Sequence, residues 1–419
     1  SLSNSVTQRR PACLVYRLRK GANSHGQLGV DLISEQVDKP VTVRSAFWNK
    51  IKQISCGGGH SLLLDENCQL FSCGWNTKKQ LAVEGEETST FQRVWCMSGI
   101  KFVNIACGWD FSCGVTDDQF LFVWGSNSHG QLGLPKGHFT ECVKPIRLQV
   151  NACSVSMGLR HTVIFNSKGE IWSTGCNKHG QLGLGSEILS SDRFQKVPKL
   201  INISHIACGQ NHTVAWNSDE KALYVWGDNK HGQLLLSSEK YMKVFVPQKI
   251  DIDVKQNVKK LLSGWTNILL WLEDGSLLTW GRNNYGQLGT DVPFGGNIVR
   301  IKLPVTVFCC WCFYFFSDGR NVADVALGSE HTICLAEDNS LWAWGWNEHA
   351  NTGTTSDDCI FIPTMVPIEI NKTSKITQIY AGSAHNFVVT EEAQTLNDSK
   401  ESNNEKRSPI SKEPSECNM

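Results

Sequence analysis

Gly21-Ala-Asn23-Ser-His-Gly26-Gln27-Leu28-Gly29 is a nine-residue phrase that recurs through this 419-residue chain. Complete copies begin again at Gly125, Gly175 and Gly281, and degenerate copies begin at Gly74, Gly227 and Gly345. The steps between the successive asparagines of the phrase are 53, 51, 50, 52, 54 and 64 residues. Because periods of about 20–50 residues are typical of propellers and solenoids, the recurrence predicts a repeat architecture instead of several unrelated domains.

A second phrase, a glycine followed three residues later by a histidine or a substitute, recurs with the same period. Its seven copies begin at Gly57, Gly108, Gly158, Gly209, Gly264, Gly328 and Gly382. We interpret the glycines within 56–59 as turn residues that adopt positive φ, and not as a phosphate-binding loop. Each histidine falls in a different repeat, so hydrogen bonding within its own turn is a better expectation than a shared metal site.

Each repeat carries four strand signals separated by turn signals, with no helical periodicity between them. Four-stranded units repeated around an axis make a β-propeller, so we predict an all-β, seven-bladed β-propeller. The chain begins with two strand signals, at 14–19 and 41–44, and ends with two more, at 376–380 and 385–390. Together these four segments complete one unit, so we expect the ring to be closed by strands from both termini.

The predicted propeller spans residues 14–390 and includes an apolar insert at about 300–318. We interpret the insert as a segment packed on the ring or as an error in the gene model. Its apolar run is too short to cross a bilayer, which needs roughly 20 apolar residues. Residues 1–13 are predicted to be disordered or an error in the gene model, and the polar tail 391–419 is predicted to be disordered.

Strand order predicts that both phrases lie on one face of the ring. If the antiparallel strands of a blade are A, B, C and D in chain order, the Gly-x-x-His turn joins A to B. The nine-residue loop joins C to D, and alternate turns open on the same face. The tryptophans that precede the first glycine of the nine-residue loop are expected to wedge between neighbouring blades. They are Trp124, Trp226, Trp280 and Trp344.

Composition limits the classes of function. Lys and Arg number 40, as do Asp and Glu, so the net charge of zero gives no support for nucleic-acid binding. Seventeen scattered cysteines without a secretory signal favour buried thiols in a reducing compartment. Cys309-Cys-Trp-Cys312 has no second ligand pair, so we expect no metal site. No Gly-x-x-x-x-Gly-Lys-Ser/Thr, His-Glu-x-x-His or Gly-x-Ser-x-Gly motif occurs, so we expect neither a cofactor nor a hydrolytic or transfer active site.

The paired phrases resemble those of the regulator of chromosome condensation repeat family, whose members are seven-bladed propellers. The resemblance covers residues 14–390 and rests on turns such as Gly57-Gly-Gly-His60 and Gly328-Ser-Glu-His331. The order of the turns and the segment Trp344-Gly-Trp-Asn-Glu-His349 are most similar to the branch of the family that regulates secretion through guanine nucleotide exchange. The resemblance implies that the protein binds a Ras-like small GTPase and regulates protein secretion and exocytosis. We expect a monomer that is located in the cytoplasm and the nucleus.

Six residues of the Gly-x-x-His turns are candidates for partner binding. The resemblance implies that acidic residues and a histidine of these turns matter, and three of the six match such positions: Asp110, Glu330 and His212. The two tryptophans stand where other repeats have non-aromatic residues, so the fold does not require them, and aromatic anchors are typical of interfaces. An arginine shares the turn position of the two acids. The six candidates are Trp109, Asp110, Arg160, His212, Trp265 and Glu330.

Two other functions compete with nucleotide exchange. One is a non-catalytic adaptor for a vesicle-tethering, exocyst-type complex or another protein complex, because many propellers of this family are scaffolds. The other is a light sensor like the plant UV-B photoreceptors of the same repeat family, which use Gly-Trp-Arg-His turns. Here Trp109 and Trp265 lie in Gly-Trp-Asp-Phe and Gly-Trp-Thr-Asn turns, which disfavours the light sensor. A nucleotide-release assay separates exchange from scaffolding.

Overall fold

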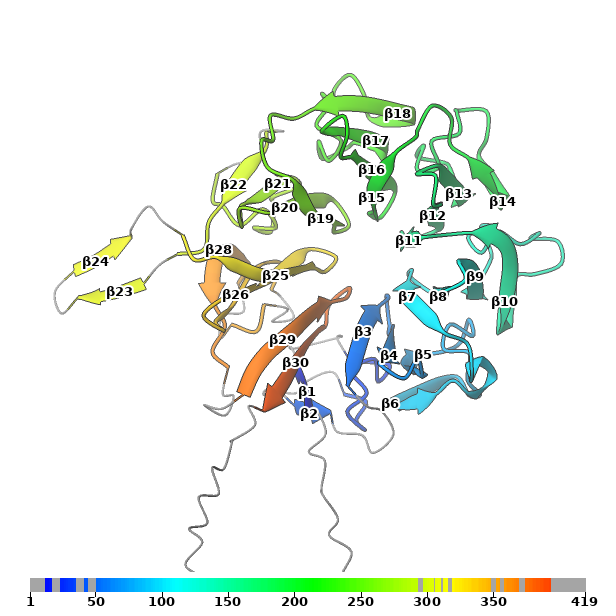
Figure 1. Ribbon diagram of the computed structural model, residues 1–419, viewed down its shortest axis with the longest axis horizontal. Coiled ribbons are helices and arrows are strands. Elements are labelled where there is room, and N and C mark those ends of the chain that lie inside the picture. Colours follow the sequence, from blue (N-terminus) through cyan, green and yellow to red (C-terminus); the bar gives the residue numbers. More distant parts are fainter. Residues whose placement is uncertain are drawn as a thin grey trace, which may run out of the picture.

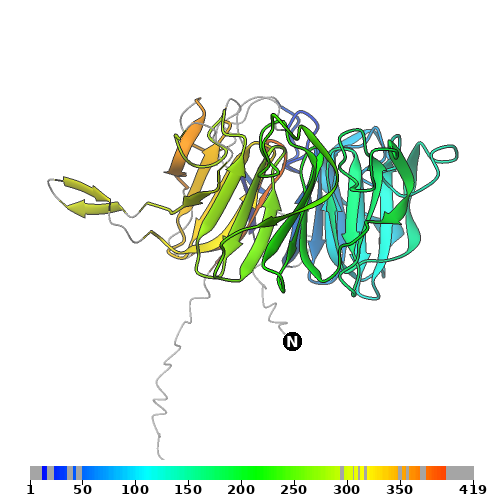
Figure 2. The ribbon, with the colours of Figure 1, turned by 90° about the horizontal axis from the view of Figure 1, so that it is seen from above.

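The computed structural model describes residues 12–16, 23–34, 41–43, 50–292, 297–304, 306–309, 312–315, 319–347, 352–354, 358–368 and 374–392. Within these residues the strands form seven four-stranded sheets and one two-stranded sheet, and the short 3-10 turn η1 (Trp95–Met97) is the helical element. The four-stranded sheets stand around a central axis (Figure 1) and together make a disc (Figure 2). The prediction of an all-β propeller is confirmed.

Six blades consist of four strands that follow one another in the chain, with the first strand nearest the axis (Figure 1). The first contains β3 (Ile51–Cys56), β4 (His60–Asp65), β5 (Leu70–Trp75) and β6 (Glu87–Arg93). The second contains β7 (Phe102–Cys107), β8 (Phe111–Thr116), β9 (Phe120–Ser126) and β10 (Glu141–Asn151). The third contains β11 (Ser154–Met157), β12 (His161–Phe165), β13 (Ile171–Cys176) and β14 (Ser190–Lys196).

The other three blades of consecutive strands repeat this order. The fourth contains β15 (Ile203–Cys208), β16 (His212–Asn217), β17 (Ala222–Asp228) and β18 (Lys243–Asp251). The fifth contains β19 (Val258–Ser263), β20 (Asn267–Leu272), β21 (Leu277–Gly281) and β22 (Val299–Ile301). The sixth contains β25 (Val322–Leu327), β26 (His331–Ala336), β27 (Leu341–Gly345) and β28 (Ile360–Met365).

The remaining four-stranded sheet, which we call the closing sheet, joins the two ends of the chain. Its order is β2 (Val41–Val43), β1 (Ala12–Tyr16), β30 (Asn386–Glu392) and β29 (Ser374–Ala381). β1 and β30 pair antiparallel from Ala12 opposite Thr390 to Tyr16 opposite Asn386. Closure by strands from both termini is therefore confirmed. The structure has six blades of consecutive strands, and the predicted count of seven is reached only if this composite sheet is counted with them.

The hydrophobic core lies between neighbouring sheets. Every residue of β4, β16, β20 and β26 is buried, because the second strand of a blade is covered on both of its faces. Exposed residues are frequent in the outermost strands, as in β18. One apolar cluster contains Val163, Trp226 and Trp280, which come from three successive blades. The alternating strand pattern of the sequence thus packs each blade against its neighbours.

The tryptophans that precede the nine-residue loop wedge between blades, as predicted. Trp124, Trp226, Trp280 and Trp344 have no exposed surface. Each indole Nε1 donates to the carbonyl of the motif glutamine in the preceding blade: Trp124 to Gln80 (2.8 Å), Trp226 to Gln181 (2.9 Å), Trp280 to Gln233 (3.0 Å) and Trp344 to Gln287 (3.1 Å). A tryptophan at this position therefore satisfies a buried backbone acceptor while it fills the space between two sheets.

The histidines of the Gly-x-x-His turns link neighbouring sheets. Their Nε2 atoms approach acceptors in the next sheet in the pairs His60–Ser112 (2.8 Å), His161–Thr213 (3.1 Å), His212–Ser263 (3.0 Å), His331–Asn386 (2.8 Å) and His385–Ser61 (3.0 Å). The Ser112 hydroxyl donates to the Gln80 carbonyl at 2.8 Å, so it accepts the Nε2 hydrogen of His60. The expectation of bonds within the turn is wrong, because each imidazole lies under its own turn glycine with Nε2 directed at the next sheet.

These buried histidines predict a specific acid sensitivity. Burial lowers the pKa to about 3 for His60, His161, His212 and His385, and to about 4 for His331. Between about pH 6.5 and pH 4 the unfolded chain therefore binds protons that the folded chain excludes, and stability falls as the pH falls. The loss reaches up to about 1.4 kcal/mol per pH unit for each histidine.

We expect the melting temperature to change little above about pH 7 and to drop steeply below about pH 6.5, as measured by circular dichroism. His161→Asn introduces the residue type that Asn267 supplies at this turn position, so it removes one titrating group. The variant should show a shallower dependence of melting temperature on pH than the unsubstituted chain. Identical slopes for the two proteins would contradict this assignment.

The repeat glycines are required for two different reasons. In the nine-residue loop, Gly125 and Gly130 have φ of 96° and 80°, in the left-handed region that favours glycine. At Gly57 the restriction is space, because an added Cβ would lie 2.3 Å from Cε1 of His60. At Gly58 it would lie 2.7 Å from the ring of Trp109. The interpretation of positive φ within 56–59 is therefore wrong, and close packing explains these glycines.

The apolar insert carries the two-stranded sheet. β23 (Thr306–Cys309) and β24 (Cys312–Phe315) pair antiparallel, and the hairpin projects from the disc beyond β22 (Figures 1 and 2). The interpretation of an insert packed on the ring is therefore wrong for this hairpin. Residues 305, 310–311 and 316–318, the segment 1–11 and the tail 393–419 lie outside the described residues. β1 starts at Ala12 and β30 ends at Glu392, close to the predicted limits of 14 and 390.

Candidate partner-binding face

The two repeated phrases meet on one side of the disc, which we call the motif face. In each blade of consecutive strands, the residue after the first glycine of the nine-residue loop donates its amide to the Gly-x-x-His turn. Ser126 donates to the Asp110 carbonyl at 3.1 Å, and Arg282 donates to the Thr266 carbonyl at 3.0 Å. The prediction that both phrases share one face is confirmed by these bonds.

The asparagine and glutamine of the nine-residue loop build the loop itself. Asn127 accepts the amide of Leu132 at 3.0 Å, and its Nδ2 donates to the carbonyls of Leu134 and Phe139, both at 2.8 Å. The Gln131 side-chain oxygen accepts the amide of a histidine two residues earlier in the chain at 2.8 Å. Because these side chains hold the loop, the residues available to a partner are the variable ones at the second, fourth and fifth positions.

The Gly-x-x-His turns converge at the centre of the motif face. They line a cavity of about 120 Å³ whose walls are mainly turn glycines and their neighbours. Backbone bonds pass from turn to turn around it: the Gln210 amide donates to the Trp265 carbonyl (3.0 Å), and the Trp265 amide to the Ser329 carbonyl (2.7 Å). The ring of turns therefore presents the second turn residues at the opening of this central cavity, which we call the channel mouth.

Trp109 and Trp265 meet across this mouth. Trp109 lies between β7 and β8, Trp265 lies between β19 and β20, and two blades separate their sheets in the ring. Their ring centroids are 5.6 Å apart with an interplanar angle of 50°. Both side chains are half-buried. The sequence predicted two separate aromatic anchors, and the structure brings them together as one aromatic platform.

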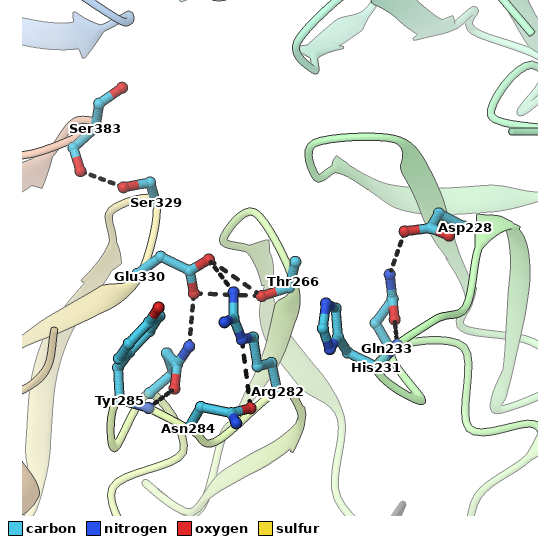
Figure 3. A network of polar contacts seen from close by, with 11 residues as sticks. Asp228, His231, Gln233, Thr266, Arg282, Asn284, Tyr285, Ser329, Glu330 and Ser383 are labelled. Atoms are coloured by element: carbon cyan, nitrogen blue, oxygen red, sulfur yellow. Dashed lines mark hydrogen bonds and ion pairs between the residues drawn. The ribbon is translucent and has the colours of Figure 1, made fainter. Parts of the chain in front are cut away.

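Glu330 is held in a polar network on the same face (Figure 3). Its carboxylate accepts from Nε2 of Gln287 at 2.7 Å and from the Thr266 hydroxyl at 3.2 Å. The Arg282 guanidinium lies 3.6 Å from the same carboxylate. Burial raises the pKa of Glu330, opposed by the bond from Gln287, the charge of Arg282 and the bond from Thr266. Glu330 is only 6% exposed, so it can affect a bound partner mainly by positioning the side chains that contact its carboxylate.

Besides Gln287 and Thr266, three residues at or beside this network were not among the candidates: Arg282, Tyr285 and Trp346. The Arg282 guanidinium carbon lies 4.6 Å from the centroid of the Tyr285 ring. The Tyr285 and Trp346 rings lie with centroids 6.4 Å apart. Arg282 and Trp346 occupy the second position of the nine-residue loop and Tyr285 the fifth, where the repeats differ from one another. That variation within a constant phrase is the signal that could have found them.

The other candidates lie in different surroundings. Asp110 is half-buried, and burial raises the pKa of its carboxyl, opposed by the bond to Ser126 and by Lys78 and Arg160. Arg160 is exposed on the motif face. His212 has no exposed surface and bonds to Ser263, so it can affect a partner only through the strands that it joins.

The described residues contain no group of three or more histidine, cysteine or acidic side chains arranged to hold a metal ion. Among them, no helix is both long enough and apolar enough to cross a membrane. The chemistry that the motif face offers is that of recognition: aromatic rings, an arginine and carboxylates on a rigid support.

Comparison with known proteins agrees with this architecture. The family model described as the RCC1-like domain matches residues 18–388. The mouse (Mus musculus) protein named secretion-regulating guanine nucleotide exchange factor is 31% identical over 400 residues, which cover 88% of this chain and 82% of the relative. The Arabidopsis thaliana ultraviolet-B receptor UVR8 is 28% identical over 346 residues, covering 80% of this chain and 73% of the receptor.

Two solved structures have the same fold. Human WBSCR16 matches with a TM-score of 0.77 at 20% identity, covering 92% of this chain and all of that one. Prp20p of Saccharomyces cerevisiae matches with a TM-score of 0.77 at 20% identity, covering 93% of both chains. Because the family model spans most of the chain and the mouse relative is similar over most of both lengths, the chain belongs to the family of RCC1-like domain proteins.

Proposed function

We propose that this protein binds a Ras-like small GTPase through the motif face, stimulates release of the bound guanine nucleotide and thereby regulates protein secretion. The observation that carries the proposal is the Trp109–Trp265 platform at the channel mouth, beside the Glu330 network. The name of the mouse relative supports exchange and secretion, and the structure of Prp20p was described with its binding to Gsp1p and histones. The proposal places the protein as a monomer in the cytoplasm and the nucleus.

Guanine nucleotide exchange of this kind needs no nucleophile, because it depends on a difference in affinity for two forms of the GTPase. A partner that binds the nucleotide-free GTPase more tightly than the nucleotide-bound form must also weaken the GTPase's hold on its nucleotide. A thousandfold weaker nucleotide affinity corresponds to about 4 kcal/mol of differential binding. A few aromatic and arginine anchors in a rigid face can supply that energy, because hot spots concentrate most of the binding free energy.

The test is nucleotide release from a panel of purified Ras-like GTPases loaded with a fluorescent guanine nucleotide. The proposal expects at least one of them to release its nucleotide faster when this protein is added. It also expects that GTPase to be retained preferentially by the immobilised protein when nucleotide is depleted. Retention without faster release would favour the adaptor function, and neither release nor retention across the panel would reject the proposal.

Substitutions on the two faces of the disc should have different effects on a GTPase found in this way. Trp109→Ala, Asp110→Ala and Trp265→Ala should each weaken binding by about 2–4 kcal/mol, because anchors at the centre of an interface dominate its energy. Lys168→Ala and Asp274→Ala change turns on the opposite face and should leave binding unchanged. Partner affinity and a melting curve should be measured for every variant. Equal losses from both faces, or affinity losses that follow melting temperature, would reject the one-face assignment.

A further inference from the structure

Positive charge is concentrated on one sector of the motif face. Lys178 and Lys230 occupy the fourth position of the nine-residue loops in the third and fourth blades, and both are exposed. Lys243 at the start of β18 reaches the neighbouring loop, where its Nζ donates to the Lys178 carbonyl at 3.2 Å. With Arg160 and Arg282 these residues form what we call the cationic sector. Asp228 and Glu330 lie within the same sector, where the cations outnumber these acids.

The sector is continuous across three blades. His129, His179 and His231 take the fifth position of successive nine-residue loops, and each is half-exposed. Burial lowers the pKa of all three, and nearby cations lower it further: Arg160 and Lys178 at His129, Lys243 and Lys178 at His179, and Arg282 and Lys230 at His231. Each histidine thus lies within the field of two cations of the sector. Asp228, which faces His179 and His231, opposes this effect.

The exposed cations of the sector form no close ion pair in the described part of the chain. There, Arg160, Lys178, Lys230 and Lys243 form no ion pair within 4.0 Å with Asp or Glu. Exposed acids are most numerous on the loop of the first blade, at Glu84, Glu86 and Glu87, whereas the third- and fourth-blade loops carry one each, Glu187 and Glu239, farther along the chain than their lysines. A face with separated charges favours a complementary partner and steers its approach.

Arg282 differs from the other cations because its position is set by the fold. Its guanidinium lies beside the buried Glu330 carboxylate, over the Tyr285 ring, and its Nε donates to the Asn284 side chain at 3.4 Å (Figure 3). One side of the guanidinium is therefore held, and the side chain remains 23% exposed. A planar guanidinium fixed in this way is suited to bind a carboxylate in a preferred direction.

The layout fits an extended acidic segment better than a small anion. No lysine or arginine lines the central cavity, so the motif face gives a free phosphate no cationic pocket there. The cations instead follow one another over three blades, beside the Trp109–Trp265 platform and the Tyr285 and Trp346 rings. Arginine and aromatic side chains together are typical of protein interfaces.

We infer that the cationic sector binds an acidic segment of the protein partner, with Arg282 held by Glu330 as its oriented contact. The inference rests on the proposed function for the identity of the partner, since both use the motif face. It adds the chemical class of the surface that the partner presents: carboxylate side chains spaced along an exposed segment.

The test measures binding of fluorescent poly-L-glutamate to the full chain by fluorescence anisotropy at low and physiological salt. Lys178→Glu combined with Lys230→Glu should weaken binding by about tenfold or more and flatten its salt dependence. The matched control, Lys168→Glu combined with Lys255→Glu, makes the same change of charge on the opposite face and should bind as the unsubstituted chain does. Equal weakening by the two double variants would overturn the inference.

Two further measurements test the contact and the class of partner. Glu330→Gln makes the sector more positive, so it should strengthen binding if Glu330 acts only by its charge. If Glu330 positions Arg282, the same variant should weaken binding, and stronger binding would overturn that role. Binding to phosphatidylserine vesicles without binding to poly-L-glutamate would identify a membrane surface instead and overturn the inference.

The inference and the proposed function can fail separately. Nucleotide release that is unchanged in the Lys178→Glu, Lys230→Glu variant would reject the acidic-segment inference and leave exchange in place. Binding of poly-L-glutamate that depends on the sector, without release from any GTPase of the panel, would support the acidic-segment inference and reject exchange.

Discussion

Deleting residues 1–45 should lower the melting temperature of the protein by about 10 °C or more. The deletion removes β1 and β2, so β30 loses the strand with which it pairs from Ala12 to Tyr16. It also removes Leu28 and Val43, which pack in the apolar cluster beside Phe71 and Phe387. Burying two such side chains contributes about 1.5–3 kcal/mol each, before the unpaired strand edge is considered. Thermal unfolding followed by circular dichroism measures the effect.

The matched control is deletion of residues 394–419, which follow the last strand. The polar composition of this tail is not expected to support a core, so its removal should leave the melting temperature unchanged. If the 1–45 deletion melted at the same temperature as the full chain, the closing sheet would not hold the ring together. Size-exclusion chromatography would show in addition whether the open edge of β30 makes the truncated protein associate.

Trp226→Ala should destabilise the fold by about 3–5 kcal/mol, the cost of removing a large aromatic side chain from a packed interior. Trp226 has no exposed surface and lies in the apolar cluster that joins three blades. Its indole also donates to the Gln181 carbonyl at 2.9 Å. Chemical denaturation should show a lower midpoint, because a cavity between two sheets cannot be filled by small shifts within either sheet.

Two variants show which part of the tryptophan matters. Trp226→Phe keeps most of the apolar contact, and Thr213 still donates to the Gln181 carbonyl at 2.8 Å, so its cost should be about 1 kcal/mol. Trp265→Ala removes a half-buried ring at the channel mouth and should cost far less than Trp226→Ala. Equal destabilisation by Trp226→Ala and Trp265→Ala would mean that packing of Trp226 between the blades contributes no special stability.

Features that repeat within one blade could be predicted from the sequence. The spacing of the two phrases indicated a propeller, and the half-units at the chain ends indicated closure by both termini. Strand parity placed the two phrases on one face, and Trp226 and its equivalents were assigned between blades. All of these depend on local order along the chain, which a repeated pattern records several times over.

Features that depend on the distance between blades could not be predicted. The imidazole of His60 reaches Ser112 because its own turn glycine covers it, and the spacing of phrases along the chain does not reveal that direction. The reason for the glycines at 57 and 58 was ambiguous in the same way, because a positive φ and a lack of space for a side chain both favour glycine. Only the packed structure shows that lack of space is the reason.

The candidate site divides in the same way. The sequence by itself determined the repeat, the closed ring and the face on which Trp109, Trp265 and Glu330 lie, because these follow from periodicity and strand order. Only the tertiary structure decided that the two tryptophans meet across the channel mouth and that Glu330 holds Arg282. The physical reason is that these contacts join residues from different blades, and the ring's geometry sets which of them come within reach.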